Sequence, residues 1–291
     1  MDRQAEDRRI FKRLISFLKK KRLSRTFPGE AMLEIGRFFL GTPYVAGTLE
    51  SKDDEQVTVN LRGFDCVTFV ENVVALTWLT EPHLQSLRHP TSLPSGGTSR
   101  PGVGGPSAGW VRSGERSFED FRHLIEKVRY RGGRLQGYSS RLHYFSDWIF
   151  DNQKKGVVRD VTRKIGGRPF RKEIHFMTSN QDLYPQLKKG AELRKMGSVE
   201  KAITRRSLFF IPKEDVRHLE DRIRDGDLIA ITTNRKGLDI QHVGLAARVK
   251  NRVHLLHASS REGKVLLSKE TLQRYLMKSR ARSGIMVARV S

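Results

Sequence analysis

A glycine turn followed by a long apolar segment constrains the first third of the chain. The segment runs from Gly63 to Leu76, and its apolar positions 66, 69, 70, 73 and 74 keep a helical period. Asp65 is a suitable N-cap, which places Cys66 in the first turn. The β-branched residues from Val67 to Val74 would also suit a strand, but the cap favours a helix. The sequence therefore predicts a helix that begins at the only cysteine of the chain.

Cys66 would occupy a position with chemical consequences. The free N–H groups and the positive dipole end at a helix N-terminus favour a thiolate, which is the nucleophilic form of cysteine. Most lone cysteines are nevertheless small buried apolar residues, and this segment alone favours burial over catalysis. A single cysteine also excludes an internal disulfide and a thiolate metal cluster.

A second informative segment lies far downstream, where two apolar stretches contain histidines. Gln241–Val249 and Arg252–Ala258 are predicted to be antiparallel strands joined by a turn at residues 250 and 251. If the turn has two central residues, His242 and His257 share one face as diagonal neighbours, whereas His254 lies on the other face. A three-residue turn would reverse this arrangement.

The cysteine and the two histidines form a candidate catalytic group. In this interpretation Cys66 attacks, His242 takes its proton and later protonates the leaving amine, and His257 orients His242. The residues Gly244 and Ala246 are small and share the face of His242, so we expect the helix that carries the cysteine to approach that face. The Cys66 N–H would contribute to an oxyanion hole. No paired carboxylate or His-x-x-x-His spacing accompanies the histidines, so the sequence predicts no metal site.

The motifs around these residues resemble a known family. Their order, Gly41-Thr42-Pro43-Tyr44, Phe64-Asp65-Cys66, His242-Val243-Gly244 and His257-Ala258, is that of the NlpC-type, papain-like cysteine peptidases. The longer strings at residues 40–50, 66–71, 141–148 and 237–239 resemble the N-acetylmuramoyl-L-alanine amidase-like branch of that superfamily. The resemblance covers roughly residues 30 to 290 apart from one insertion, and four motifs in the right order are more specific than one.

This resemblance implies a fold and a function. The implied fold is α+β and papain-like, with an antiparallel sheet packed on the Cys66 helix and further helices over the cleft. The implied substrates are peptidoglycan fragments, hydrolysed at the amide between the muramic acid lactyl group and L-alanine without a metal or cofactor. A γ-D-glutamyl peptidase of the same superfamily is the alternative enzyme. Residues that would support or line the substrate cleft are Tyr44, Glu71, Arg141, Tyr144, Asp147 and Asp239. For Glu71, a structural salt bridge is an equally good interpretation.

The charge of the chain points to anionic partners without choosing among them. The formal net charge is +23, which suits nucleic acid, acidic lipid or anionic polymers of the cell envelope. A non-catalytic basic binding protein is therefore a rival interpretation, although no stacking-aromatic or helix-turn-helix signature supports specific nucleic-acid binding. No apolar run is long enough for a membrane span or a signal-peptide core. Location in the envelope or periplasm is thus implied by the resemblance alone, and a cytoplasmic location is the alternative.

The chain is expected to divide into a basic helical segment, residues 1–29, and a single domain, residues 30–291. A Pro/Gly/Ser-rich loop is predicted at about residues 90–116, because such a composition cannot bury enough apolar surface to order itself. Helices are predicted near residues 8–25, 31–39, 117–133, 141–155 and 212–223. Strands are predicted at 207–211 and 228–232, and residues 157–203 are expected to hold short strands and a helix or two.

Overall fold

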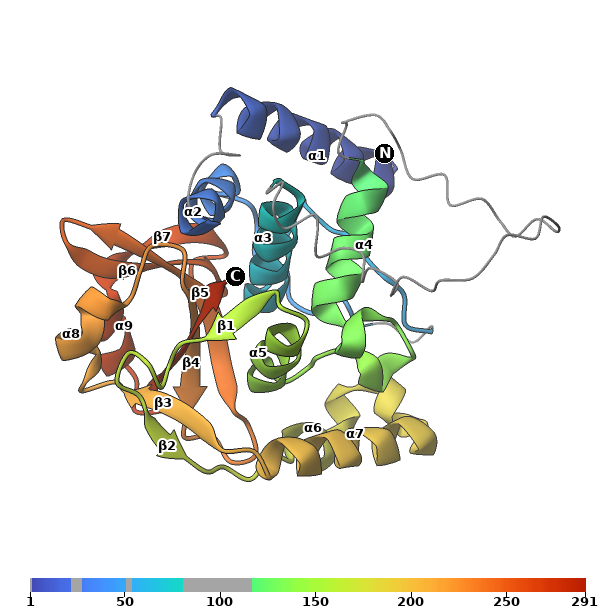
Figure 1. Cartoon of the computed structure of the whole chain (residues 1–291). Coiled ribbons are helices and arrows are strands. Elements are labelled where there is room, and N and C mark those ends of the chain that lie inside the picture. The colour runs from blue at the N-terminus through green and yellow to red at the C-terminus, as the bar shows by residue number, and fades with distance from the viewer. Residues whose placement is uncertain (1, 22–27, 51–53, 81–116) are drawn as a thin grey trace, which may run out of the picture.

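The computed structural model describes residues 2–21, 28–50, 54–80 and 117–291, and the predicted loop at 90–116 lies outside these ranges (Figure 1). Its α-helices are α1 (Arg3–Lys20), α2 (Pro28–Phe38), α3 (Cys66–Thr80), α4 (Phe118–Arg129), α5 (Phe145–Lys154), α6 (Phe176–Ser179), α7 (Gly190–Thr204), α8 (Val216–Leu219) and α9 (Leu272–Met277). Among the described residues, no helix is both long and apolar enough to span a membrane.

An antiparallel sheet forms the other half of the fold. Its strands are β1 (Val158–Asp160), β2 (Arg168–Phe170), β3 (Leu208–Pro212), β4 (Leu228–Thr233), β5 (Ile240–Val249), β6 (Arg252–Ser259), β7 (Lys264–Thr271) and β8 (Arg282–Val290). The order is β2-β3-β8-β4-β5-β6-β7, with β1 also paired to β8. The predicted combination of helices with an antiparallel sheet is confirmed.

Side chains on the two faces of the sheet enter different apolar clusters. On β5, Val243, Leu245 and Ala247 join the large cluster formed with helices α1 to α5, which lie on one side of the sheet in Figure 1. The alternate residue Ala246 joins a second cluster, to which α8 and α9 also contribute. This alternation follows from the two-residue period of a strand, and it decides which groups can face the cysteine helix.

Helix α3 begins where the sequence predicts. The Asp65 carboxylate accepts a hydrogen bond from the Thr68 N–H at 2.7 Å, and the Thr68 hydroxyl oxygen accepts one from the Asp65 N–H at 3.0 Å. These two bonds satisfy backbone donors that a helix start leaves unpaired. From Thr68 to Thr80 every residue of the helix is buried, so α3 is fixed in the centre of the molecule with Cys66 at its outer end.

The basic helix α1 is part of the folded core. Its apolar face buries Phe11, Leu14, Ile15 and Leu18, which favours packing over attachment to an acidic surface through that face. In addition, the buried Asp7 carboxylate accepts the Leu61 N–H at 2.8 Å and pairs with Arg62 at 3.1 Å. The helix is thereby tied to the segment that leads into Cys66.

The helix predicted at 141–155 starts later, at Phe145. The expected cap does not form because the Ser140 hydroxyl donates to the Gly137 carbonyl and accepts the Gln136 N–H instead. Residue Arg141 is extended and pairs with Tyr130 in a β-bridge. The prediction was therefore wrong for residues 141–144, where long-range pairing replaces the first helical turn.

The helix predicted at 212–223 is also corrected. Pro212 ends strand β3 opposite Gly284, and the next residue, Lys213, still donates its N–H to the Ser283 carbonyl. Pairing with β8 thus occupies the residues expected to begin a helix, and only the short α8 and a 3-10 turn follow. The strands predicted at 207–211 and 228–232 are confirmed as β3 and β4.

Candidate active site

Cys66 meets the sheet at strand β5. The backbone N–H groups of Val243, Cys66 and Val67 lie near its sulfur, and each favours the thiolate. Tyr44 pairs with Phe64 in a β-bridge. Burial is the main cause of the raised pKa of its phenol, and negative charge on the nearby Cys66 is the second cause. The sulfur therefore sits among backbone donors, one residue along β5 from His242.

The hairpin has the predicted two-residue turn. Lys250 and Asn251 have φ values of 47° and 62°, as the tight turn of a twisted hairpin requires, and Val249 pairs with Arg252. In this register His242 and His257 are diagonal neighbours on one face, as expected. Nε2 of His242 and Nδ1 of His257 lie 2.6 Å apart in a hydrogen bond. Nδ1 of His242 therefore remains available for another partner.

The cysteine helix does not pack on the face predicted from the sequence. We expected small residues to admit α3 on the face of His242, but α3 packs on the opposite face, which carries Val243 and Leu245. The physical reason is at Gly244, where a Cβ atom would lie 2.9 Å from the His257 Cβ. The glycine thus makes room for the second histidine instead of for a helix.

Cys66 approaches the histidines through the end of the β5–β6 ladder. The pairing of these strands runs from the turn to Leu245 and Leu256, so the ladder has ended before Val243. A strand N–H lies in the plane of its sheet, and the Val243 N–H lies near the Cys66 sulfur, where it favours the thiolate. The thiol therefore lies beside β5, beyond the last β5–β6 pair at Leu245 and Leu256.

Burial leaves these groups uncharged at rest. Cys66 as a whole residue is partly accessible, but its pKa is raised to about 12. The larger cause is the protein packed around its sulfur, and the smaller cause is the Asp65 carboxylate. Burial is the main cause that lowers the pKa of His242 to about 3 and that of His257 to about 4. The positive charge of Arg282 contributes to both values, and His257 contributes to that of His242. At neutral pH the resting groups are a thiol and two neutral imidazoles.

The two buried imidazoles predict an acid-sensitive fold. Free histidine titrates near pH 6.5, so below that pH the unfolded chain binds protons that folded His242 and His257 do not accept until about pH 3 to 4. The free energy of unfolding should fall by up to about 1.4 kcal/mol per pH unit for each histidine between pH 6.5 and 4. Urea denaturation at several pH values measures this slope, which should be shallower when both are asparagine. An unchanged slope in the double variant would contradict the prediction.

Two cavities border the candidate site. One, of about 190 Å³, adjoins the start of α3 and is lined by Asp65, Thr68, Glu71, Arg141, Tyr144 and Tyr184 among others. The other, of about 380 Å³, lies against the histidine pair and is lined by His242, His257, Tyr275, Arg282 and polar residues of β6 and β7. Tyr275 and Arg282 were missed by sequence reasoning, because no motif marks them and only the fold brings them to the histidines.

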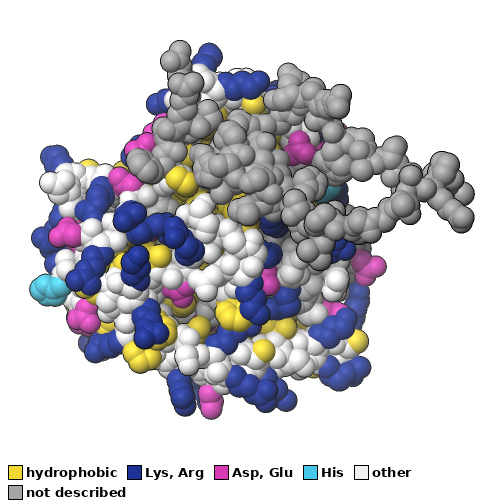
Figure 2. All heavy atoms as spheres, in the orientation of Figure 1, with side chains coloured by type: hydrophobic (Ala, Val, Ile, Leu, Met, Phe, Trp, Pro, Cys, Tyr) yellow, Lys and Arg dark blue, Asp and Glu magenta, His cyan; other side chains and the backbone are white. Residues whose placement is uncertain are grey.

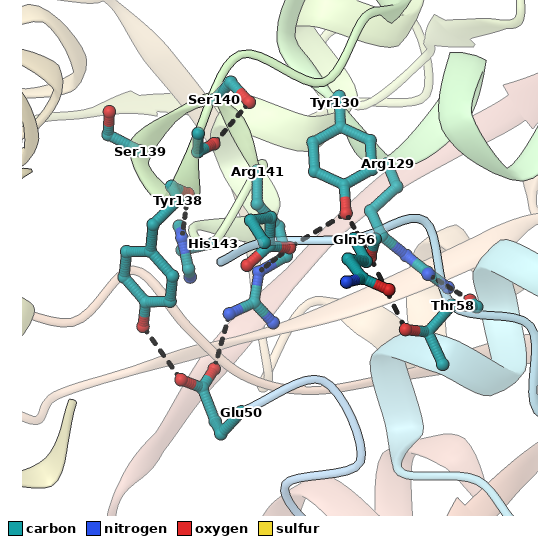
Figure 3. A network of polar contacts seen from close by, with 12 residues as sticks. Glu50, Gln56, Thr58, Arg129, Tyr130, Tyr138, Ser139, Ser140, Arg141 and His143 are labelled. Carbon is teal, nitrogen blue, oxygen red and sulfur yellow. Dashed lines mark hydrogen bonds and ion pairs between the residues drawn. The ribbon is translucent and has the colours of Figure 1, made fainter. Parts of the chain in front are cut away.

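Arg141 lies in a polar network beside the first cavity (Figure 3). It pairs with Glu50 at 2.7 Å and with Glu55 at 3.2 Å, and Glu50 also accepts the Tyr138 hydroxyl at 3.0 Å. Two carboxylates thus neutralise one guanidinium. Of the predicted substrate residues, the structure brings Glu71, Arg141 and Tyr144 to this cavity. The positive charge of Arg141 is already balanced by Glu50 and Glu55.

Glu71 is paired with Arg129 in the interior. The two side chains are 2% and 1% exposed and lie 2.7 Å apart, and Arg129 also donates to the Thr58 carbonyl (Figure 3). This placement favours the structural salt bridge that the sequence left open.

Breaking this pair should destabilise the protein strongly. Arg129→Met leaves the Glu71 carboxylate buried without its partner, which costs about 3 to 5 kcal/mol. The exposed pair of Arg8 and Glu119, also 2.7 Å apart, supplies the control, and Arg8→Met should cost at most about 1 kcal/mol. Chemical denaturation measures both, and equal losses would contradict the structural role.

The remaining predicted substrate residues make polar contacts inside the protein. Asp147 is fully buried between Arg131 and Arg206. The buried Asp239 carboxylate accepts the Ser146 N–H at 2.8 Å. Tyr144 donates to Glu200 at 2.6 Å in addition to lining the cavity. Within the described parts of the chain, no group of three histidine, cysteine or acidic side chains is arranged to hold a metal ion.

Comparison with known proteins shows the family to which the chain belongs. Over most of its length the chain is similar to proteins described as amidases or amidase-like. It belongs to the AmiA-like, N-acetylmuramoyl-L-alanine amidase-like family, whose profile matches residues 34–90 and 109–285. No functionally curated protein matches it.

Several solved structures are similar to this chain. An N-acetylmuramoyl-L-alanine amidase from Bacteroides uniformis has 34% identity and a TM-score of 0.76, over 91% of this chain and 99% of that one. A putative xylanase from Bacteroides fragilis also has 34% identity, with a TM-score of 0.72 over 88% and 98% of the two chains. A Legionella pneumophila protein at 22% identity and a TM-score of 0.65, over 99% and 95%, shares the fold.

Proposed function

We propose that this protein is a cysteine-dependent hydrolase with an NlpC-type, papain-like fold that cleaves the amide between N-acetylmuramic acid and L-alanine in peptidoglycan fragments. The observation that carries the proposal is the approach of Cys66 to β5 beside His242, which is hydrogen-bonded to His257 at 2.6 Å. The family and the amidase from Bacteroides uniformis support the substrate.

In the first half of the reaction, the Cys66 sulfur attacks the lactyl carbonyl carbon while His242 takes the thiol proton. A C–S bond forms, and the carbonyl oxygen becomes an oxyanion that the N–H groups at the start of α3 can stabilise. The C–N bond then breaks as His242 gives its proton to the amine of L-alanine. The peptide leaves, and a thioester to the muramoyl group remains on Cys66.

Water completes the cycle. His242 takes a proton from water as the water oxygen attacks the thioester. The C–S bond then breaks to release the muramic acid carboxyl group, and His242 returns the proton to the sulfur, which regenerates the thiol. His257 stabilises the imidazolium in both halves through the hydrogen bond to His242. Because both resting groups are neutral, proton transfer creates a thiolate beside an imidazolium, and their attraction offsets the cost of two buried charges.

The positive charge of the chain would hold anionic polymers of the cell envelope, where we propose that the protein acts. Lysine and arginine side chains outnumber acidic ones over the face shown in Figure 2. Binding of this kind weakens steeply with salt. Tight, sequence-selective nucleic-acid binding at high salt would instead favour a basic binding protein.

Product analysis tests the proposed reaction. Incubation with defined muropeptides should release a peptide that begins with L-alanine together with an intact muramic acid sugar, both identified by mass. Cleavage after D-glutamate would indicate the γ-D-glutamyl peptidase. Glycan cleavage, as the name of the Bacteroides fragilis protein suggests for that protein, would overturn both. A chelator should leave the activity unchanged, because the proposed chemistry uses no metal.

A further inference from the structure

The cavity beside the histidine pair is rich in positive charge. Its lining includes four cations, Arg261, Lys269, Lys278 and Arg282, and two carboxylates, Glu262 and Glu270. Glu270 is already paired with Lys278. Arg282 forms no ion pair with any carboxylate in the described ranges of the chain, so the cavity contains a cation whose charge is not matched by a neighbouring side chain.

The structure holds this arginine in one place. Its guanidinium carbon lies 3.9 Å from the centre of the Tyr275 ring, and Nη1 donates to the Tyr275 carbonyl. Stacking on an aromatic ring and a single backbone bond orient the planar guanidinium without consuming its other donors. Among the described residues, Nε and Nη2 have no hydrogen-bond acceptor, and they form the fork that binds a carboxylate in two parallel bonds.

The arginine is also close to the reacting groups. The Tyr275 ring centre is 5.5 Å from that of His257 and 6.3 Å from that of His242. The positive charge of Arg282 lowers the pKa of both histidines, which agrees with this proximity.

The proposed reaction decides which part of the substrate enters this cavity. His242 must give a proton to the leaving amine, so the amine side of the broken bond lies against His242 and continues into the cavity that His242 lines. In muropeptides that side is the stem peptide. Its first carboxylate is the α-carboxyl group of D-glutamate, the second residue, and two extended residues span about 7 Å.

We propose that Arg282 binds the α-carboxylate of D-glutamate, which makes this cavity the subsite for the stem peptide. The inference rests on the proposed function. Arg141, the predicted cleft residue of the same type, is less suited to this contact because Glu50 and Glu55 neutralise its charge.

Two substrates that differ in one group test the inference. N-acetylmuramoyl-L-alanyl-D-glutamate and its counterpart with the α-carboxyl group amidated are hydrolysed in parallel, and kcat/KM is measured for each. Wild type should prefer the acid by about 10- to 100-fold, as expected for a charge-assisted bidentate contact. Arg282→Gln should remove most of this preference by slowing the acid only, and Arg282→Lys should keep part of it. Arg280→Gln, an exposed arginine two residues away that does not line the cavity, should preserve it.

The possible outcomes distinguish a failure of the inference about Arg282 from a failure of the proposed function. If both substrates are cleaved equally well by wild type, the inference is wrong and the proposed function stands. A preference that survives in a folded Arg282→Gln variant likewise overturns the role of Arg282. If neither substrate is cleaved, the proposed function fails and the inference with it. The wild-type comparison does not depend on any variant folding.

Discussion

Replacement of Cys66 by alanine is expected to reduce muropeptide hydrolysis to background while leaving the fold intact. The thioester cannot form without the sulfur, and loss of the nucleophile in such catalytic groups costs on the order of a millionfold in kcat. Stability should change little, because the substitution removes a single sulfur atom at the end of α3, and the Asp65 and Thr68 bonds that start the helix do not involve it.

Two measurements check this prediction together. Turnover of a defined muropeptide gives the loss of activity, and thermal unfolding shows whether the variant is folded. A neighbouring substitution in the same turn, Val67→Ala, is the control and should keep most of the activity. A folded Cys66→Ala variant that still hydrolyses the substrate at a substantial rate would exclude the cysteine mechanism.

The second large effect is expected at His242. His242→Ala removes the base of the first step and the acid that releases the amine, so kcat should fall on the order of a thousandfold or more. His257→Ala should cost less, because His257 acts through its hydrogen bond to His242. The matched control is His254→Ala, since His254 lies on the other face of β6 and bonds to the Ser268 carbonyl at 2.9 Å.

The ranking of the three histidine variants is the informative result. Steady-state kinetics should give a severe loss for His242, an intermediate loss for His257 and almost none for His254. A silent His257→Ala together with a severe His254→Ala would contradict the roles that the hairpin register assigns.

The parts of the site that the sequence predicted are those set by neighbours in the chain. The start of α3 depends on Asp65 and Thr68, three residues apart, and the facing histidines depend on a two-residue turn. Both follow from local rules of capping and strand alternation. The resemblance to a known family then suggested that the Cys66 segment and the histidine hairpin act together, which no local rule could predict.

The parts that could not be predicted depend on distant partners. The first turn of the expected helix at 141–144 was displaced by pairing with Tyr130. The side of the sheet on which α3 packs depended on whether Gly244 faced a helix or His257. Likewise, the charges of Arg141 and Arg282 look alike in the sequence, and only the fold shows that two carboxylates neutralise the first.

The most direct test of the account is to identify the covalent intermediate. Wild-type protein is mixed with a defined muropeptide, quenched in acid during turnover, and analysed by intact and peptide mass spectrometry. We expect an N-acetylmuramoyl group in thioester linkage to the peptide that contains Cys66, with no amino acid of the stem attached. An adduct on another residue, an adduct that still carries L-alanine and D-glutamate, or turnover without any adduct would contradict it.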